Sequence, residues 1–395
     1  NIKITNITSS SAIITWQTDE PADSLVKYGK EKGNYTKETY NSTRVTNHMI
    51  KISKLAPDTT YYFVVNSTDI FGNSAQSLEF SFKTLEVNAT YPCLFFNNIS
   101  EIPNYQNKDT GWIIDKANSY LRYNFTNANK DWMARAKAKI AMRFLGLAYQ
   151  ITKNSTYAEK CAEGLLQVAD PVAFDWVADY LLKADGEVFA EIREKLAERA
   201  DELYRNYNCW DDGSAKLKNL VELTLIVLVL QDYDSDQYDI QAWQEAVKDW
   251  MVKSDPSGRP AYVAYFNYGG LCRGREPYVE DELLSLLWWA YAYKHNFGSF
   301  GESRVLEAFK VPIYTMLPDG KRPNMGAQGN KFDLFLKYMW YTHGDLLTEE
   351  WKSWTKWYID KYLQPLGYPY YPIERDFEDE RIWKFLFYDG SVNAT

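Results

Sequence analysis

The spacing of hydrophobic residues changes once along this chain of 395 residues, near residue 89, and this change limits the possible folds more than any other feature. Before it, apolar and polar residues alternate in short runs such as "SAIITWQT" and "TTYYFVVNST". That period predicts half-buried β-strands. After it, apolar residues recur every three or four positions, which predicts helices. We therefore expect a multidomain protein: an all-β, immunoglobulin-like sandwich over residues 1–86, a linker over 87–110 and a large all-α domain over 111–390.

Two segments of the helical part differ in how their apolar residues are distributed. "LVELTLIVLVL" (220–230) is apolar nearly all round, as expected for an inner, surrounded helix. "FAEIREKLAERADELYRNY" (189–207) is amphipathic and highly charged, as expected for an outer helix, and we place its pairs Glu191–Lys195 and Glu194–Glu198 on a face in water. Alternation of inner and outer helices predicts an (α/α) toroid.

The chain is acidic, with a net charge of −9, and 16% of its residues are aromatic. An acidic surface argues against nucleic acid as a partner, because phosphate binding requires basic residues. An acidic polysaccharide would require the basic residues to gather in one cleft. The aromatic share is typical of carbohydrate-binding proteins and equally of wide helical cores. The longest apolar run, 220–230, contains Glu222 and is too short for a transmembrane segment.

Nine Asn-X-Ser/Thr sequons occur, where roughly three are expected by chance, and the excess indicates a secreted or cell-surface glycoprotein. The predicted glycosylation sites are Asn6, Asn34, Asn41, Asn66, Asn88, Asn98, Asn124, Asn154 and Asn393. Most lie before residue 157, so we expect glycans to cover one end of the molecule.

Cysteine and histidine usage fits the same compartment. Four cysteines without a Cys-x-x-Cys spacing are candidates for structural disulfides, whose connectivity the sequence leaves open. They are Cys93, Cys161, Cys209 and Cys272. Only three histidines occur and none has ligand spacing with another, so we expect neither a metal nor a cofactor.

The β part resembles a fibronectin type III domain. "LAPDTTYYFVV" (55–65) has the Leu-x-Pro-x-Thr-x-Tyr pattern of that family, and "DIFGNS" followed by "FKT" is similar to its final hairpin. The resemblance implies that Trp16 is the core ring and that Tyr61 is the corner tyrosine. It also implies a spacing, orienting or adhesive role for the domain.

Three segments of the helical part resemble the toroid of heparinase II/III-like (alginate lyase-like) polysaccharide lyases. They are the Asp-Trp motif and following helix (173–204), the glycine-rich loop before "EDELLSLLWWAYAY" (269–293) and "LPDGKRPNMGAQGNKFDLFLKYMWYTHGD" (317–345). In that family a β-sandwich usually follows the toroid. The resemblance therefore implies that residues 391–395 are a tail leading to a further C-terminal domain.

The lyase resemblance implies a site for β-elimination on a uronate-containing polysaccharide. Tyr278 matches the family's loop tyrosine, which acts as the base. Arg273 and Arg275 supply the positive charge that lowers a tyrosine pKa and grips a carboxylate. In the alternative interpretation Tyr278 packs in the first turn of a helix and the arginines pair with Glu280 or Asp281.

The family's second catalytic residue, a histidine or asparagine at the start of an inner helix, has no histidine counterpart here. Asn219 is the only amide in reach, and it is equally explained as a solvent-facing residue. His343 is a further candidate, although a histidine beside a helix C-cap glycine also favours the helix dipole.

Two functions follow from these observations. The first is a secreted, glycosylated polysaccharide lyase-like protein, whose partner is an acidic polysaccharide or cell-surface glycan. The alternative is a non-catalytic structural glycoprotein of the cell surface, a surface-layer or extracellular filament subunit that self-assembles. Both place the protein outside the cell or on its surface.

Overall fold

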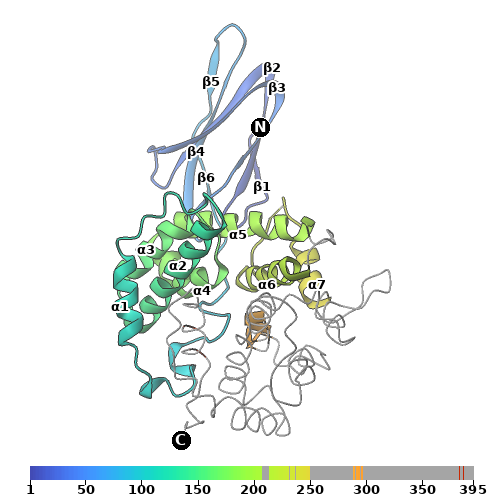
Figure 1. The fold of residues 1–395 in the computed structure, drawn as a ribbon. Coiled ribbons are helices and arrows are strands. Elements are labelled where there is room, and N and C mark those ends of the chain that lie inside the picture. Colours follow the sequence, from blue (N-terminus) through green and yellow to red (C-terminus); the bar gives the residue numbers. More distant parts are fainter. Residues whose placement is uncertain are drawn as a thin grey trace, which may run out of the picture.

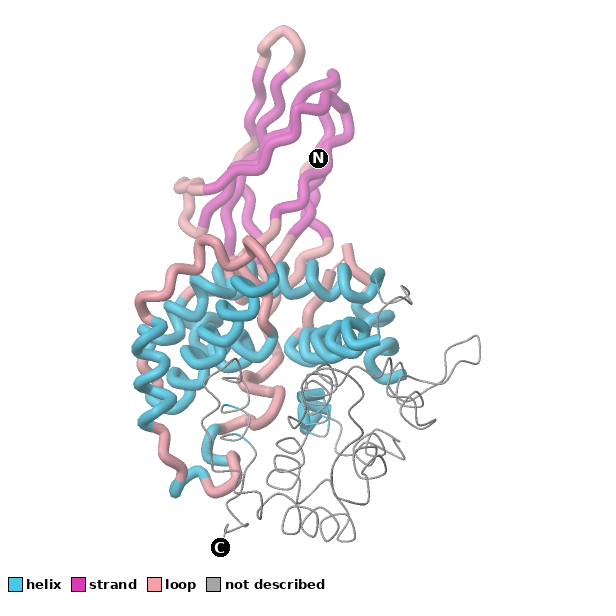
Figure 2. The backbone as a smooth tube through the Cα atoms, in the orientation of Figure 1, coloured by secondary structure: helices cyan, strands magenta, loops and turns pink. Residues whose placement is uncertain are grey.

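The computed structural model describes residues 1–206, 213–230, 232–235 and 237–249, with 288–289, 291–293, 295–296, 382 and 386. Within these residues a β-domain (residues 1–84) is followed by a helical domain, which confirms the predicted fold class (Figure 1). The two domains are stacked, with the strands projecting from one side of the helical layer (Figure 2). The second half of the predicted toroid falls outside the described residues.

The β-domain is a six-stranded antiparallel sheet built around two long strands that pair with each other. The strands are β1 (Lys3–Thr5), β2 (Ala12–Gly29), β3 (Lys37–Ile52), β4 (Thr60–Thr68), β5 (Ser74–Gln76) and β6 (Phe80–Lys83). Residues 12–17 of β2 pair with β1 and the end of β3, whereas 25–29 pair with β4. Register shifts between Gln17 and Ser24 separate the two halves, and such bulges bend a strand.

Trp16 and Tyr61 are both buried in the core of the β-domain, as predicted. The Trp16 indole stacks on the His48 ring with centroids 4.8 Å apart, and its Nε1 donates to the Ser67 hydroxyl at 2.9 Å. The Tyr61 hydroxyl accepts a hydrogen bond from the Ala56 backbone N–H at 2.9 Å, which fastens β4 to the loop before it.

The helices of the described helical domain begin and end where the sequence provides caps. They are α1 (Gly111–Tyr120), α2 (Trp132–Thr152), α3 (Ser155–Leu165), α4 (Pro171–Ala184), α5 (Gly186–Asn206), α6 (Gly213–Val229) and α7 (Ile240–Asp249), preceded by the 3-10 helices η1 (Ile99–Glu101) and η2 (Tyr105–Asn107). Asp131, Asn154 and Asp170 cap α2, α3 and α4 through side-chain oxygens. From Leu220 to Val229, α6 is buried except at Glu222, which confirms that it is a surrounded helix.

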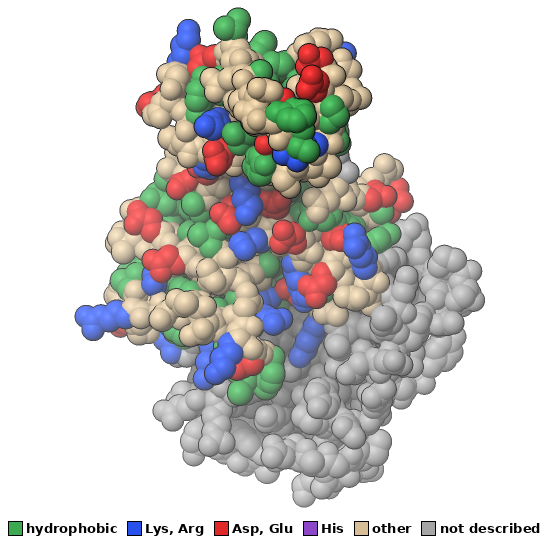
Figure 3. Space-filling model, turned by 90° about the horizontal axis from the view of Figure 1, so that it is seen from above, with side chains coloured by type: hydrophobic (Ala, Val, Ile, Leu, Met, Phe, Trp, Pro, Cys, Tyr) green, Lys and Arg blue, Asp and Glu red, His purple; other side chains and the backbone are tan. Residues whose placement is uncertain are grey.

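The charged face of α5 differs from its prediction, because part of it docks onto the β-domain instead of facing water. Glu187 binds Lys30 at 3.1 Å and Lys37 at 2.7 Å, and Glu191 binds Lys54 at 3.2 Å. Helical periodicity could not predict this contact, because the lysine partners lie more than 130 residues earlier in the chain. Figure 3 shows Lys and Arg interspersed with Asp and Glu where the two domains meet.

The docking contact is also close-packed. A Cβ atom placed on Gly186, the first residue of α5, would lie 2.9 Å from the Ala56 Cβ and 3.2 Å from the Pro57 Cδ. The Tyr61 hydroxyl donates to Glu187 Oε1 at 3.2 Å. Together with the ion pairs, these contacts fix the β-domain against the start of α5.

The segment predicted as a linker is bound to the helical domain along its first part. The Asn88 N–H donates to Asp232 Oδ2 at 3.0 Å, and the Tyr91 hydroxyl donates to the Val229 carbonyl at 2.8 Å. Residues 92–96 are buried. The exit from the β-domain is thus anchored beside α6.

Candidate functional site

Most of the predicted catalytic residues lie outside the described residues. These are Tyr278, Arg273, Arg275 and His343. Asn219 is the member of the set that the structure places, in the first half of α6 and half-buried. Its amide makes no hydrogen bond to any residue that the structure describes.

Glu222, one turn after Asn219, is held as a carboxylate between two helices. Lys139 of α2 binds one oxygen at 2.6 Å, and Arg199 of α5 binds the other at 2.8 Å. Burial alone would raise the pKa of Glu222, but the two cations outweigh burial and hold that pKa at about 2. Glu222 therefore stays ionised at neutral pH and positions helices rather than transferring protons.

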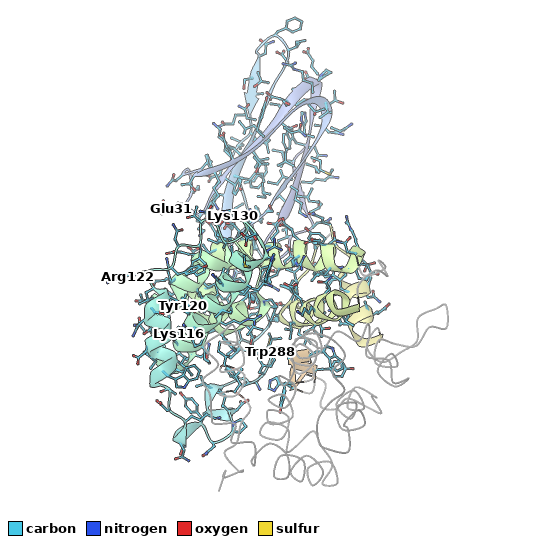
Figure 4. The ribbon with its side chains drawn as sticks, in the orientation of Figure 1. Glu31, Lys116, Tyr120, Arg122, Lys130 and Trp288 are labelled. Carbon is cyan, nitrogen blue, oxygen red and sulfur yellow. The ribbon has the colours of Figure 1, made fainter. Side chains whose placement is uncertain are left out.

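Arg143 connects α2, the start of α4 and the helix that follows the predicted loop. Its guanidinium binds Asp170 through Nε at 3.1 Å and Nη2 at 2.9 Å, while Asp170 also accepts the Ala173 N–H at 2.8 Å. The guanidinium carbon lies 5.6 Å from the centre of the Trp288 ring. Figure 4 shows Trp288 beneath the layer formed by α4 and α6. Trp288 is ten residues after Tyr278 in the sequence.

Asp175, from the Asp-Trp motif that resembles the lyases, positions the chain in this structure. Its carboxyl accepts the Cys93 N–H at 2.7 Å and the Leu94 N–H at 3.1 Å. Complete burial raises the pKa of Asp175 to about 7, although the two N–H groups favour the carboxylate and limit the rise. Asn296 donates to the Cys93 carbonyl at 3.1 Å, so the same segment also contacts the helix after the predicted loop.

Sequence reasoning missed a basic stretch around the start of α2. Residues 116–143 contain seven Lys or Arg and one acidic residue, Asp131, in a chain whose net charge is −9. Arg122, Lys130, Arg135 and Lys137 are exposed and form no ion pair with any described residue. A count of charge over a short window would have revealed this stretch, which the net charge of the whole chain hides.

Seven of the eight predicted glycosylation sites within the described residues are exposed, and Asn66 is half-buried. At Asn98, Asn124 and Asn154 the side-chain oxygen accepts the N–H of the third sequon residue at 2.9–3.1 Å. This arrangement leaves each Nδ2, the atom to which a glycan is attached, directed away from that bond. Asn393 lies outside the described part.

Cys161, one of the four disulfide candidates, is a free thiol in this structure. α3 directs its side chain into the core, where Sγ contacts the Met142 carbonyl at 3.4 Å, and burial raises its pKa. Cys93 is buried, and Cys209 and Cys272 are outside the described residues. No group of His, Cys, Asp and Glu that could hold a metal occurs among the described residues. None of the described helices is long and apolar enough to cross a membrane.

The β-domain is similar to a known domain family. Residues 1–84 match the N-terminal domain of purple acid phosphatases, a β-sandwich. The match ends before the helical domain and assigns no activity to it. No heparinase or lyase family matches, so the lyase resemblance stays a prediction. No curated protein matches the chain.

Solved structures offer weak likenesses. A computationally redesigned β-sandwich protein is 27% identical over 22% of this chain and 94% of its own, with a TM-score of 0.19. A family 76 glycoside hydrolase from a bovine Bacteroides thetaiotaomicron strain is 12% identical over 79% of this chain and 76% of its own, with a TM-score of 0.18. A β-1,2-glucanase from Parabacteroides distasonis is 10% identical over 87% of this chain and 54% of its own, also at 0.18. At these TM-scores none of the three carries an argument about function.

Proposed function

We propose that this chain is a secreted glycoprotein whose helical domain cleaves a uronate-containing polysaccharide by β-elimination. The observation that carries the proposal is the place of Asn219. Its amide is half-buried on the surrounded helix α6 and has no hydrogen-bond partner among the described residues. An amide in this position can donate to a uronate carboxylate, which makes the neighbouring C–H more acidic.

The remaining chemistry falls to the loop before Trp288. Tyr278 removes the proton next to the carboxylate, and the released electron pair forms the carbon–carbon double bond as the glycosidic C–O bond breaks. A proton donor then protonates the departing oxygen. A tyrosine ordinarily has a pKa of about 10. The charges of Arg273 and Arg275 favour its ionised form and also bind the carboxylate.

The exposed sequons support a place outside the cell. Asparagines that accept their own sequon's N–H and leave Nδ2 in solvent are suitable for glycan attachment. Their number on the β-domain and on the first helices favours an extracellular protein.

The test is to incubate the purified protein with a panel of uronate polysaccharides and to record ultraviolet absorbance of the unsaturated product. We expect product with at least one substrate, and its loss in Tyr278→Phe and Asn219→Ala. Asn206→Ala, at the exposed end of α5, is the matched control and should retain activity. The absence of unsaturated product with every substrate contradicts the proposal, as does full activity in Asn219→Ala.

A structural surface glycoprotein is the second candidate, and exposed apolar residues on either side of β5 favour it. Ile70 and Phe71 precede β5 and Leu78 follows it, and the three are 68%, 83% and 85% exposed. Asp69 accepts the Phe71 N–H at 2.8 Å and the Asn73 N–H at 2.9 Å. Light scattering of the wild type and of Phe71→Ser tests this function: a large assembly that Phe71→Ser disperses supports it, and a monomeric wild type excludes it.

A further inference from the structure

The first turns of α2 project from the helical domain with a composition that suits an anionic ligand. Trp132 is 75% exposed and Met133 is 52% exposed, followed by the exposed Arg135 and Lys137. Residues three or four apart are neighbours on a helix surface. Trp132 therefore lies next to Arg135, and Met133 lies next to Lys137.

The cations at this end of α2 lack the acidic partners that neutralise the rest of the helix. Further along, Lys139 binds Glu222 and Arg143 binds Asp170. In contrast, Arg135 and Lys137 form no ion pair with any residue that the structure describes. The single acidic residue nearby, Asp131, uses Oδ1 to accept the Ala134 N–H at 2.8 Å.

The loop before α2 extends the same positive surface. Arg122 and Lys130 are exposed and likewise form no ion pair within the described residues. Figure 4 shows Arg122 on the side of the helical domain near α1 and Lys130 on the side that faces the β-domain. Cations that form no ion pair within the described residues produce a positive potential even in a protein whose net charge is negative.

An exposed tryptophan beside unpaired cations indicates a particular ligand chemistry. A large aromatic ring in water is unfavourable unless it serves a contact, and its face suits the C–H face of a pyranose. Guanidinium and ammonium groups bind carboxylates. Since Asp131 already caps the helix, the ligand would be bound by side chains and not by the free N–H groups of the helix start.

The direction of α2 relates this surface to the predicted catalytic loop. Trp132 and Arg143 are eleven residues apart, a distance of about 16 Å along a helix. Arg143 contacts Trp288, which belongs to the helix that follows the loop. A polymer bound at the start of α2 can therefore extend along the helix toward Trp288.

We propose that the start of α2 and the loop before it form a polysaccharide-binding surface for acidic chains, built from Trp132, Arg135, Lys137 and the flanking Arg122 and Lys130. The ligand class follows the proposed function, but binding here does not require catalysis. The surface lies outside the predicted catalytic loop and holds the polymer through carboxylates and ring faces.

The test measures binding of the full chain to immobilised polygalacturonate at low ionic strength, with fully methyl-esterified polygalacturonate as the uncharged match. We expect Arg135→Glu/Lys137→Glu to bind polygalacturonate roughly tenfold more weakly, because two cations that attract carboxylates are replaced by anions that repel them. Lys3→Glu/Lys183→Glu makes the same charge change on other exposed lysines and should leave binding unchanged. Trp132→Ala should weaken binding even at high salt, where charges are screened.

Three outcomes separate the proposals. Equal binding by the charge-reversal variant and the wild type, or equal binding to the esterified polymer, overturns the surface. Loss of binding in the Lys3/Lys183 control also overturns it, because overall charge would then be the cause. Binding by the wild type without product from any substrate supports the surface and removes the lyase function, whereas binding that persists in Tyr278→Phe while product is lost supports both proposals. Circular dichroism establishes folding, and Trp132→Ala provides an independent measurement if the double variant unfolds.

Discussion

α5 and α2 are both strongly charged helices, yet their charges do different things. On α5, Glu187 and Glu191 face the β-domain and pair with its lysines. On α2, Arg135 and Lys137 face solvent and have no partner among the described residues. A charged helix face therefore excludes a place in the apolar core, but it does not separate a domain interface from a free surface.

The largest expected loss of stability follows from removing the partner of Arg143 in the second half of α2. Asp170→Ala leaves the Arg143 guanidinium without its carboxylate and removes the cap of α4. We expect a loss of about 3–5 kcal/mol in the free energy of unfolding, because a largely buried cation is left unpaired. Urea unfolding provides the measurement. Asp131→Ala, which removes the exposed cap of α2, should cost only about 1 kcal/mol, and equal costs would contradict the distinction.

A pH titration tests whether buried carboxyls behave differently from paired ones. The pKa of Asp175 rises from 3.8 to about 7 on folding. The folded state therefore binds a proton that the unfolded state has lost, and the free energy of unfolding should fall as pH rises between these values. For Glu222, with a pKa lowered from 4.5 to about 2, stability should be lost as pH falls through that range. The slope between pH 4 and 7 should be smaller in Asp175→Asn, and an unchanged slope would assign it to other groups.

The close contact at the start of α5 can be tested sterically. Gly186→Val places atoms where the Ala56 Cβ already lies. We expect a loss of about 1–3 kcal/mol, the usual cost of overpacking, and earlier proteolysis between the domains. Gly111→Ala, where the nearest atom is the flexible Asp109 side chain at 3.2 Å, is the control. Identical proteolysis of both variants would show that the contact does not hold the domains together.

Charge removal at the same contact should have a smaller effect. Glu187→Gln weakens the attraction to Lys30 and Lys37, both partly exposed. Since such pairs contribute about 0–1 kcal/mol each, we expect a shift in the melting temperature of a few degrees at low salt that diminishes at high salt. A shift independent of salt would assign the loss to packing with Tyr61.

The smallest effect on stability is expected from substitutions of Arg135 and Lys137 at the start of α2. Arg135→Ala/Lys137→Ala should change the free energy of unfolding by less than about 0.5 kcal/mol, as surface substitutions do, while polygalacturonate binding falls. A marked loss of stability would reveal a structural partner for these cations and remove the contrast with α5.

Local features could be predicted from the sequence where one segment contains the cause. The fibronectin type III resemblance of the local sequence implied that Trp16 and Tyr61 are core residues, and both rings are buried in the β core. α6 was recognisable as surrounded because apolar residues cover all its sides. The face of α5 and the free thiol of Cys161 could not be predicted in the same way, because their surroundings come from distant segments.

For the candidate site, too, the sequence supplied the residues and the tertiary structure supplied their surroundings. The sequence named Asn219, and the structure shows that its amide has no hydrogen-bond partner among the described residues, while Glu222, one turn later, is neutralised by Lys139 and Arg199. The basic stretch at 116–143 was present in the sequence and hidden by the net charge of the whole chain.

By itself the sequence determined the two-domain order, the strand and helix periods, the helix caps and the position of every charge, since these depend on residues within a few positions of one another. Only the tertiary structure decided which charges meet a partner. The glutamates of α5 pair with lysines of the β-domain, and Lys139 and Arg143 of α2 pair with Glu222 and Asp170. The cations at the start of α2 have no such partner among the described residues. The reason is physical, because an ion pair depends on distance in space, and for this chain that distance is set by packing between residues far apart in the sequence.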